Sequence, residues 1–132
     1  MDELSVLIIE DDEIAAEIIQ KMVQHHRPQA RVAWCWNGYE ALVRIQEVQP
    51  DVIFLDYMMP KLDGLEFLNN LRHLEPSKPY LIAIVSAYVD KLNDPDLLAL
   101  GVDAVMPKPI SIEQIENLLN QVEEKRKAAA NR

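Results

Sequence analysis

Five polar residues of this chain follow apolar stretches, and their types are those that handle phosphate and divalent cations. Glu10 and Asp11 come after the apolar run 6–9, and Asp56 comes after the run 52–55. Ser86 follows the run 80–85, and Lys108 follows the run 102–106 after one proline. Each residue alone could simply begin a turn. Together they supply three carboxylates, a hydroxyl and an ammonium, which can do chemistry if the fold gathers them.

The chemistry that this set suggests is transfer of a phosphoryl group to a carboxylate. Carboxylates held close together repel one another strongly unless a positive charge joins them. Mg²⁺ suits such a group because it prefers oxygen ligands and takes only one or two carboxylates directly. A carboxylate can also attack phosphorus and form an aspartyl phosphate. Of the three oxygens of that product, a metal could bind one, the Lys108 ammonium another and the Ser86 hydroxyl the third.

Short apolar runs alternate with segments of helical periodicity along the chain. Residues Ile14, Ile18 and Met22, spaced by four, mark the first helix, and Asp12 is placed to cap it. Five rounds of strand and helix with short connections favour an α/β fold with a parallel sheet covered by helices on both faces. Strands are expected at 6–9, 31–36, 52–55, 80–85 and 102–106, and helices at 13–27, 39–48, 65–75, 95–100 and 112–122.

The parallel sheet explains why the five polar residues matter as a group. Parallel strands place their C-terminal ends on one edge of the sheet, where open α/β sheets hold their ligands. Every one of the five residues stands at such an end. The sequence therefore predicts a single site at that edge.

Composition limits the classes of partner. The chain has 132 residues, which is the size of one domain, and its net charge is −9. A surface that negative repels nucleic-acid backbones and anionic lipid, so we expect neither as a direct partner. Cys35 is the single cysteine, which excludes an internal disulfide and favours a reducing compartment. The N-terminus lacks signal-peptide order and no apolar run approaches about 20 residues, so a cytoplasmic location is expected.

The sequence resembles response-regulator receiver domains, the modules that sensor histidine kinases of two-component systems phosphorylate on aspartate. The resemblance covers about residues 4–122. It rests on motifs in family order and at family spacing: LIIEDD at 7–12, NGYEAL at 37–42, DYMMPKLDG at 56–64, VSA at 85–87 and KP at 108–109. It implies a doubly wound, flavodoxin-like sheet of five parallel strands in the order 2-1-3-4-5, with five helices.

The resemblance also implies a role for each site residue. Asp56 would accept the phosphoryl group, and Asp11 would bind Mg²⁺ directly, with Asp56 as a further ligand. Glu10 would act through water, and Met58 would offer its backbone carbonyl to the metal. The phosphoryl oxygens would be bound by Ser86 and Lys108, and the peptide bond between Lys108 and Pro109 would be cis. The phosphoryl donor would be a histidine kinase, a phosphotransfer protein or a small phosphodonor.

One position departs from the family pattern. Many receivers carry an aromatic residue three positions before the lysine, and here that position holds Val105. Either the loop 86–88 carries the signal, with Tyr88 as a substitute aromatic, or the active state is weakly coupled to phosphorylation. Met58 and Tyr88 are also expected to flank Asp56 and slow attack by water. Output would pass to a protein target through the helix at 95–100, the fifth strand and the last helix.

Three other functions compete with that of a receiver. An aspartate-based phosphohydrolase usually needs an acid two residues after the nucleophile, where this chain has Met58. A pseudo-receiver that serves as a phosphorylation-independent binding scaffold remains an alternative because of Val105. No glycine-rich loop follows the first strand, which argues against a nucleotide-binding domain. We interpret the chain as a signalling domain that turns over no metabolite and is therefore not an enzyme.

Three further expectations concern the edges of the fold. The receiver domain should occupy 1–124, and 125–132 should form a charged tail that either extends the last helix or frays. Trp34 and Trp36 should lie on one face of an edge strand and pack under a helix; the alternative is that one of them contacts a partner. Cys35 should be a small buried residue.

Overall fold

The fold is a five-stranded parallel sheet in a computed structural model that describes residues 3–59, 63–75, 80–87 and 95–130. The strand order is β2-β1-β3-β4-β5, as the resemblance implied. Each pair of neighbouring strands is parallel. The strands are β1 Ser5–Ile9, β2 Arg31–Cys35, β3 Val52–Asp56, β4 Leu81–Ser86 and β5 Ala104–Pro107.

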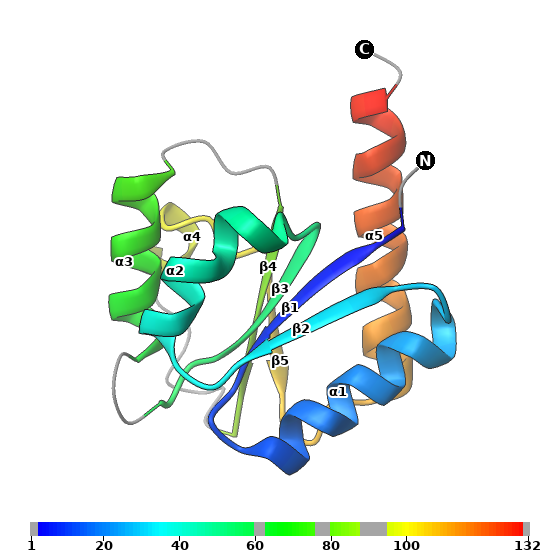
Figure 1. Cartoon of the computed structure of the whole chain (residues 1–132), viewed down its shortest axis with the longest axis horizontal. Coiled ribbons are helices and arrows are strands. Elements are labelled where there is room, and N and C mark those ends of the chain that lie inside the picture. Colours follow the sequence, from blue (N-terminus) through cyan, green and yellow to red (C-terminus); the bar gives the residue numbers. More distant parts are fainter. Residues whose placement is uncertain (1–2, 60–62, 76–79, 88–94, 131–132) are drawn as a thin grey trace.

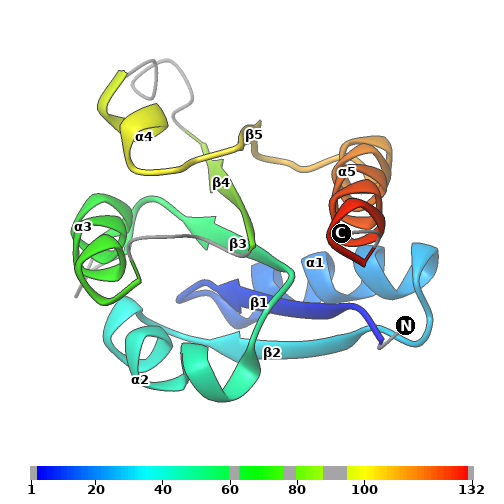
Figure 2. The same ribbon diagram turned by 90° about the horizontal axis from the view of Figure 1, so that it is seen from above.

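Helices cover both faces of this sheet, which makes the fold doubly wound (Figures 1 and 2). On one face lie α1 and α5, and on the other lie α2, α3 and α4. The helices are α1 Glu13–His26, α2 Gly38–Val48, α3 Gly64–Leu74, α4 Pro95–Ala99 and α5 Ile112–Ala130.

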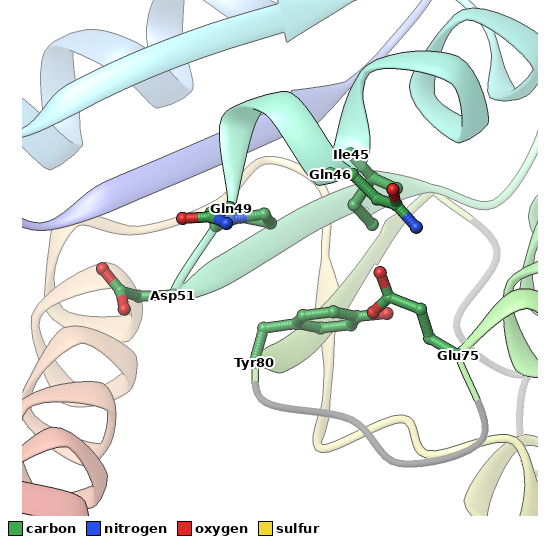
Figure 3. A pocket seen from close by; sticks show the side chains of 7 residues that line it. Ile45, Gln46, Gln49, Asp51, Glu75 and Tyr80 are labelled. Carbon is green, nitrogen blue, oxygen red and sulfur yellow. The ribbon is translucent and has the colours of Figure 1, made fainter.

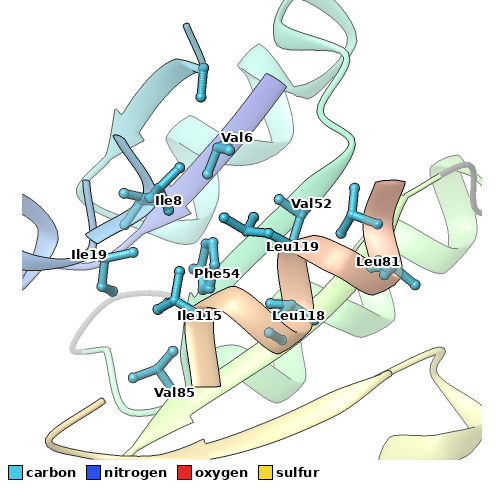
Figure 4. Packing of buried hydrophobic residues seen from close by; sticks show 14 of the residues in the cluster. Val6, Ile8, Ile19, Val52, Phe54, Leu81, Val85, Ile115, Leu118 and Leu119 are labelled. Atoms are coloured by element: carbon cyan, nitrogen blue, oxygen red, sulfur yellow. The ribbon is translucent and has the colours of Figure 1, made fainter. Parts of the chain in front are cut away.

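The core consists of two apolar layers, one on each face of the sheet. On the α1 and α5 side, Val6, Ile8 and Phe54 pack with Ile19 and Ile115 (Figure 4). Residues at the alternate strand positions point to the α2 and α3 side. Because helices cover both faces, β1, β3 and β4 are buried along their whole length, which explains their unbroken apolar runs.

Side chains at the helix starts fix where the chain leaves the sheet. Asp12 caps α1 by accepting a hydrogen bond from the Ile14 N–H, as predicted. Ser111 and Gln114 form a capping box before α5, since the Gln114 N–H donates to the Ser111 hydroxyl oxygen and the Ser111 N–H donates to the Gln114 amide oxygen. Gly101 follows α4 with a φ of 89°, a left-handed value that suits glycine at a helix end. Asp94, which precedes Pro95 as is typical of a helix start, lies outside the described residues.

The structure differs from the expectations at several boundaries. β2 ends one residue before Trp36, and β5 begins at Ala104. The helix α5 continues to Ala130, so the chain beyond 124 extends the helix as far as it is described, and the domain boundary itself stays a prediction. Trp34 packs against the α1 and α5 layer, whereas Trp36 is 55% exposed, so the expectation that both pack under a helix was wrong for Trp36. Cys35 is fully buried, as expected.

None of the described helices combines the length and the hydropathy needed to cross a membrane.

Candidate functional site

The strand register brings the predicted site residues to one edge of the sheet. Ile9 of β1 pairs with Leu55 of β3, so the residues that follow them, Glu10 and Asp56, stand at the same level. Asp56 pairs in turn with Val85. On the far side of β4, Ser86 pairs with Pro107, and Lys108 comes next. Strand pairing alone therefore gathers these side chains at the C-terminal edge.

Three carboxylates converge at this edge. Glu10, Asp11 and Asp56 each place one carboxylate oxygen within 4.8 Å of the other two. Glu10 is 1% exposed and Asp56 is 7% exposed, whereas Asp11 is exposed. The cluster is thus buried on the side of the sheet and open on the side of Asp11, which is the arrangement of a site that a solute can reach.

Lys108 supplies positive charge to the cluster, and its closer partner is Glu10. Its Nζ atom lies 2.9 Å from Glu10 Oε1 and 3.8 Å from Asp56 Oδ1. Burial disfavours the charged ammonium, but the hydrogen bond to Glu10 and the charge of Asp56 outweigh it and raise the pKa of Lys108. One ammonium faces three carboxylates, so negative charge remains in excess.

Glu10 shows the effect of this excess most clearly. Burial, together with the neighbouring Asp56 carboxylate, raises the pKa of Glu10 to about 8, although Lys108 opposes the change. Its second oxygen, Oε2, is buried without a hydrogen-bond partner among the described residues. A buried carboxylate oxygen without a partner, beside two more carboxylates, fits a divalent cation with oxygen ligands. The donor set is therefore suited to Mg²⁺.

Backbone contacts hold the cluster from the neighbouring strands. The Glu10 N–H donates to the Cys35 carbonyl at 3.0 Å, and the Trp34 indole Nε1–H donates to the Glu10 carbonyl at 2.7 Å. The Met58 N–H donates to Asp56 Oδ1 at 3.2 Å. The Lys108 N–H donates to the Ser86 carbonyl at 2.9 Å. Glu10, Asp56 and Lys108 are thus attached to backbone that is itself hydrogen-bonded.

Gly64 contacts the backbone of Tyr57, the residue that follows Asp56. The Gly64 N–H donates to the Tyr57 carbonyl at 3.0 Å. A Cβ atom at position 64 would lie 2.9 Å from the Tyr57 Cα atom, closer than real Cβ contacts. This close approach requires glycine and explains the glycine at the end of the DYMMPKLDG motif.

For the other predicted residues, the structure gives their burial but does not test their roles. Ser86 is buried at the end of β4, and the Met58 side chain is exposed. The role of the Met58 carbonyl stays a prediction, and Tyr88 lies outside the described residues. Val105 stands on the edge strand β5 and is 37% exposed, so it does not pack in the core. The peptide bond between Lys108 and Pro109 is cis, as expected.

Sequence reasoning missed the contact between Trp34 and Glu10. Trp34 was interpreted as a packing residue, and part of its ring does pack against the apolar layer. Its position two residues before the end of an apolar, alternating segment gave no sign of a hydrogen bond to the neighbouring strand. The signal that could have found it is the family strand order, which places β2 beside β1.

A hollow of about 550 Å³ lies at the opposite edge of the sheet (Figure 3). Gln49 and Asp51 line it near the start of β3, and Tyr80 lines it near the start of β4, with Glu75 facing the tyrosine. None of its lining residues belongs to the acidic cluster. The hollow and the cluster are therefore separate features at the two ends of the strands.

Comparisons with known proteins agree with this geometry. A family model described as the response regulator receiver domain matches residues 6–120. The probable C4-dicarboxylate response regulator DctR of Halalkalibacterium halodurans is 36% identical over 121 residues, which are 92% of this chain and 52% of the relative. The protein of the same name from Bacillus subtilis is 32% identical and covers 98% of this chain and 57% of the relative. The chain spans about half the length of these curated relatives.

Solved structures show the same fold at comparable identity. The N-terminal domain of an uncharacterised protein from Wolinella succinogenes is 31% identical with a TM-score of 0.80, and the match covers 96% of this chain and 98% of that one. A CheY-like receiver domain from Methylobacillus flagellatus is 25% identical with a TM-score of 0.80 and covers 92% and 99%. With an acidic cluster at the strand ends and a family match over most of its length, the chain belongs to the response-regulator receiver domains, which are signalling modules.

Proposed function

We propose that this domain accepts a phosphoryl group on Asp56 and passes the resulting signal to a protein partner. One observation carries the proposal, which is the convergence of Glu10, Asp11 and Asp56 at the strand ends with Lys108 beside them. Buried carboxylates with too little compensating charge are costly, and such costs are typical of functional sites.

In the proposed reaction, one oxygen of the Asp56 carboxylate attacks the phosphorus of the donor. An oxygen–phosphorus bond forms while the bond between phosphorus and the leaving group breaks. With a phosphohistidine donor, the leaving imidazole nitrogen takes the electron pair of that bond and then a proton. The product is an aspartyl phosphate, a mixed anhydride that water can later hydrolyse to restore the carboxylate.

Several residues would support this step. Asp11 and Asp56 would hold Mg²⁺, with Glu10 acting through water and Met58 offering its carbonyl. When bound, Mg²⁺ supplies positive charge that offsets the phosphoryl oxygens. Lys108 lies 2.9 Å from Glu10 and 3.8 Å from Asp56, so its ammonium stands beside the carboxylate that would carry the phosphoryl group. Ser86 would donate its hydroxyl to another phosphoryl oxygen.

The proposed phosphoryl donor is a sensor histidine kinase or a phosphotransfer protein. For output, we favour the surface of α4, β5 and α5, which presents apolar side chains to solvent. Leu98 of α4 is 76% exposed and Val105 of β5 is 37% exposed. With Val105 in place of an aromatic residue, the signal would not depend on a ring at that position turning inward.

Incubation with acetyl phosphate and Mg²⁺, followed by intact mass measurement, tests the proposal. We expect the native protein to gain the mass of one phosphoryl group and the Asp56→Asn variant to gain none. Asp12→Asn is a matched control because it makes the same change beside the site while asparagine still caps α1. This control should be phosphorylated like the native protein.

The same experiment separates the receiver from its alternative. If the native protein folds normally but gains no mass from acetyl phosphate or from a histidine kinase, the reading as a phosphoacceptor is wrong. The domain would then act as a phosphorylation-independent binding scaffold.

A further inference from the structure

We propose that Trp34 is a positioning residue for the acidic cluster, holding the peptide that joins Glu10 to Asp11 so that both carboxylates face Asp56. The inference rests on the proposed function, since it assigns to Trp34 a part in binding Mg²⁺ and in preparing Asp56. Trp34 itself touches neither the metal nor the phosphoryl group; it acts through the backbone of Glu10.

The contact is built by the register of two neighbouring strands. Trp34 of β2 pairs with Ile8 of β1, two residues before Glu10. From this position the indole Nε1–H reaches forward along the strand and donates to the Glu10 carbonyl at 2.7 Å. The next residue of β2, Cys35, accepts from the Glu10 N–H at 3.0 Å. Two successive residues of β2 therefore hold both polar backbone groups of Glu10.

The planarity of the peptide bond extends this hold to Asp11. The Glu10 carbonyl and the Asp11 N–H belong to one rigid plane, so fixing the direction of the carbonyl also fixes where the Asp11 backbone begins. Within the described part of the chain, Asp11 makes no hydrogen bond of its own. Beyond β1 and before α1, the Trp34 indole thus orients the peptide that joins two of the three carboxylates.

Trp34 is itself held firmly enough to serve this role. Its ring packs against the apolar layer under α1 and α5 and lies edge-on to the Trp36 ring, with centroids 6.1 Å apart. The carbonyl of Trp34 accepts from Arg44 Nη1 at 3.3 Å. A side chain fixed at its ring and its backbone can impose an orientation on the group to which it donates.

A tryptophan in such a place could instead be a packing residue whose N–H happens to be satisfied. The two roles differ in what the hydrogen bond controls. A packing role predicts that loss of the N–H donor changes the free energy of unfolding alone. A positioning role predicts that the same loss weakens Mg²⁺ binding, since outer groups that orient metal ligands typically contribute about 10- to 100-fold in affinity.

The test compares Trp34→Phe with Trp36→Phe. Both replace indole by phenyl, but within the described residues Trp36 makes no hydrogen bond through its indole and is largely exposed. Mg²⁺ affinity is measured by NMR titration of backbone amides, and the free energy of unfolding by urea in the presence of EDTA. We expect roughly tenfold weaker Mg²⁺ binding in Trp34→Phe and native affinity in Trp36→Phe.

A second measurement needs no change at Trp34. In the native protein, the indole N–H signal of Trp34 should exchange slowly with solvent and shift on addition of Mg²⁺, whereas that of Trp36 should do neither. Trp36→Phe assigns the two signals by removing one of them. If Trp34→Phe does not fold, this measurement decides the matter on the native chain.

The outcomes separate this inference from the proposed function. If the native protein neither binds Mg²⁺ nor gains a phosphoryl group, the proposed function fails. Suppose instead that the native protein does both. The positioning role is then overturned if Trp34→Phe binds Mg²⁺ as tightly as Trp36→Phe, or if the Trp34 indole signal does not shift on addition of Mg²⁺. The receiver function stands in either case.

Discussion

Acidic side chains stand at both ends of the strands, but the partners of their carboxylates differ between the two ends. At the N-terminal edge, Asp51 Oδ2 accepts from the Ser5 N–H at 2.8 Å, and Asp103 Oδ2 accepts from the Ile82 N–H at 2.8 Å. The backbone N–H of each aspartate also donates to its partner's carbonyl, Asp51 to Ser5 and Asp103 to Ile82, both at 2.8 Å. Each aspartate thereby completes the hydrogen bonding between two neighbouring strands. At the C-terminal edge the carboxylates face one another instead.

This difference teaches how to tell a structural carboxylate from a functional one. Asp51 has a backbone donor and the Arg126 guanidinium, 3.8 Å from its second oxygen, so its charge is compensated within the fold. Glu10 has one ammonium to share with Asp56 and an oxygen with no partner among the described residues. A carboxylate that stabilises the fold finds its hydrogen-bond donors and its positive charge within the fold. A carboxylate that lacks enough positive charge nearby is available to a cation or an electrophile.

Removing the ammonium from the C-terminal edge should have the largest effect. In Lys108→Ala, the phosphoryl oxygens lose the cation that we expect to bind them as charge develops. Loss of one such donor typically slows a reaction by between about 10²- and 10³-fold. The rate of mass gain from acetyl phosphate in saturating Mg²⁺ measures this directly.

Lys21→Ala is the matched control for the lysine. Lys21 lies on the surface of α1 and pairs with Glu17 at 3.1 Å, and neither residue belongs to the acidic cluster. Its loss should leave the phosphorylation rate unchanged. A Lys108→Ala variant that is phosphorylated at the native rate would show that the ammonium balances Glu10 alone.

The pH dependence of stability should reveal the crowding of charge at this edge. The pKa of Glu10 is raised from 4.5 in the reference state to about 8 in the fold. Between these values the folded state holds a proton that the unfolded state has released, so the free energy of unfolding falls as pH rises. In EDTA, Glu10→Gln should therefore be more stable than the native protein at pH 9, by on the order of 2 kcal/mol, and nearly equal to it at pH 4.5.

Urea denaturation at pH 4.5, 7 and 9 measures this trend, with Glu116→Gln as the control. Glu116 is exposed on α5, and its replacement should leave the pH profile of the native protein unchanged. Addition of Mg²⁺ should stabilise the native protein more than Glu10→Gln. A native pH profile in Glu10→Gln would mean that Lys108 compensates Glu10 fully and that the edge is not short of positive charge.

Most of the fold could be predicted from the sequence because local patterns and the fold agree. The apolar runs of β1, β3 and β4 are unbroken since helices bury both faces, and the helix caps Asp12 and Ser111 follow directly from residue type. The convergence of Glu10, Asp11 and Asp56 could also be predicted, since strand ends of a parallel sheet share an edge.

Features that depend on side-chain direction across strands could not be predicted. Periodicity gave Trp34 and Trp36 the same face, but it did not show that β2 ends at Cys35 and leaves Trp36 in solvent. Residue types also could not show that Lys108 lies closer to Glu10 than to Asp56. Which carboxylate the ammonium approaches depends on the lengths of the side chains within the folded site.

At the N-terminal edge, changes to Asp51 should lower stability and leave the chemistry intact. Asp51→Ala removes the acceptor for the Ser5 N–H and the partner of Arg126. A buried N–H left without an acceptor costs about 1–3 kcal/mol, and water can reach part of this position, so we expect a loss of about 1 kcal/mol in the free energy of unfolding. Asp51→Asn keeps an acceptor oxygen and should lose less.

Both Asp51 variants should bind Mg²⁺ and accept a phosphoryl group as the native protein does, because Asp51 precedes β3 whereas Asp56 ends it. The distinction between the two edges requires this independence. Should Asp51→Ala weaken Mg²⁺ binding beyond what its stability loss explains, the carboxylate at the start of β3 would be coupled through the strand to the one at its end. A structural aspartate would then also be part of the site.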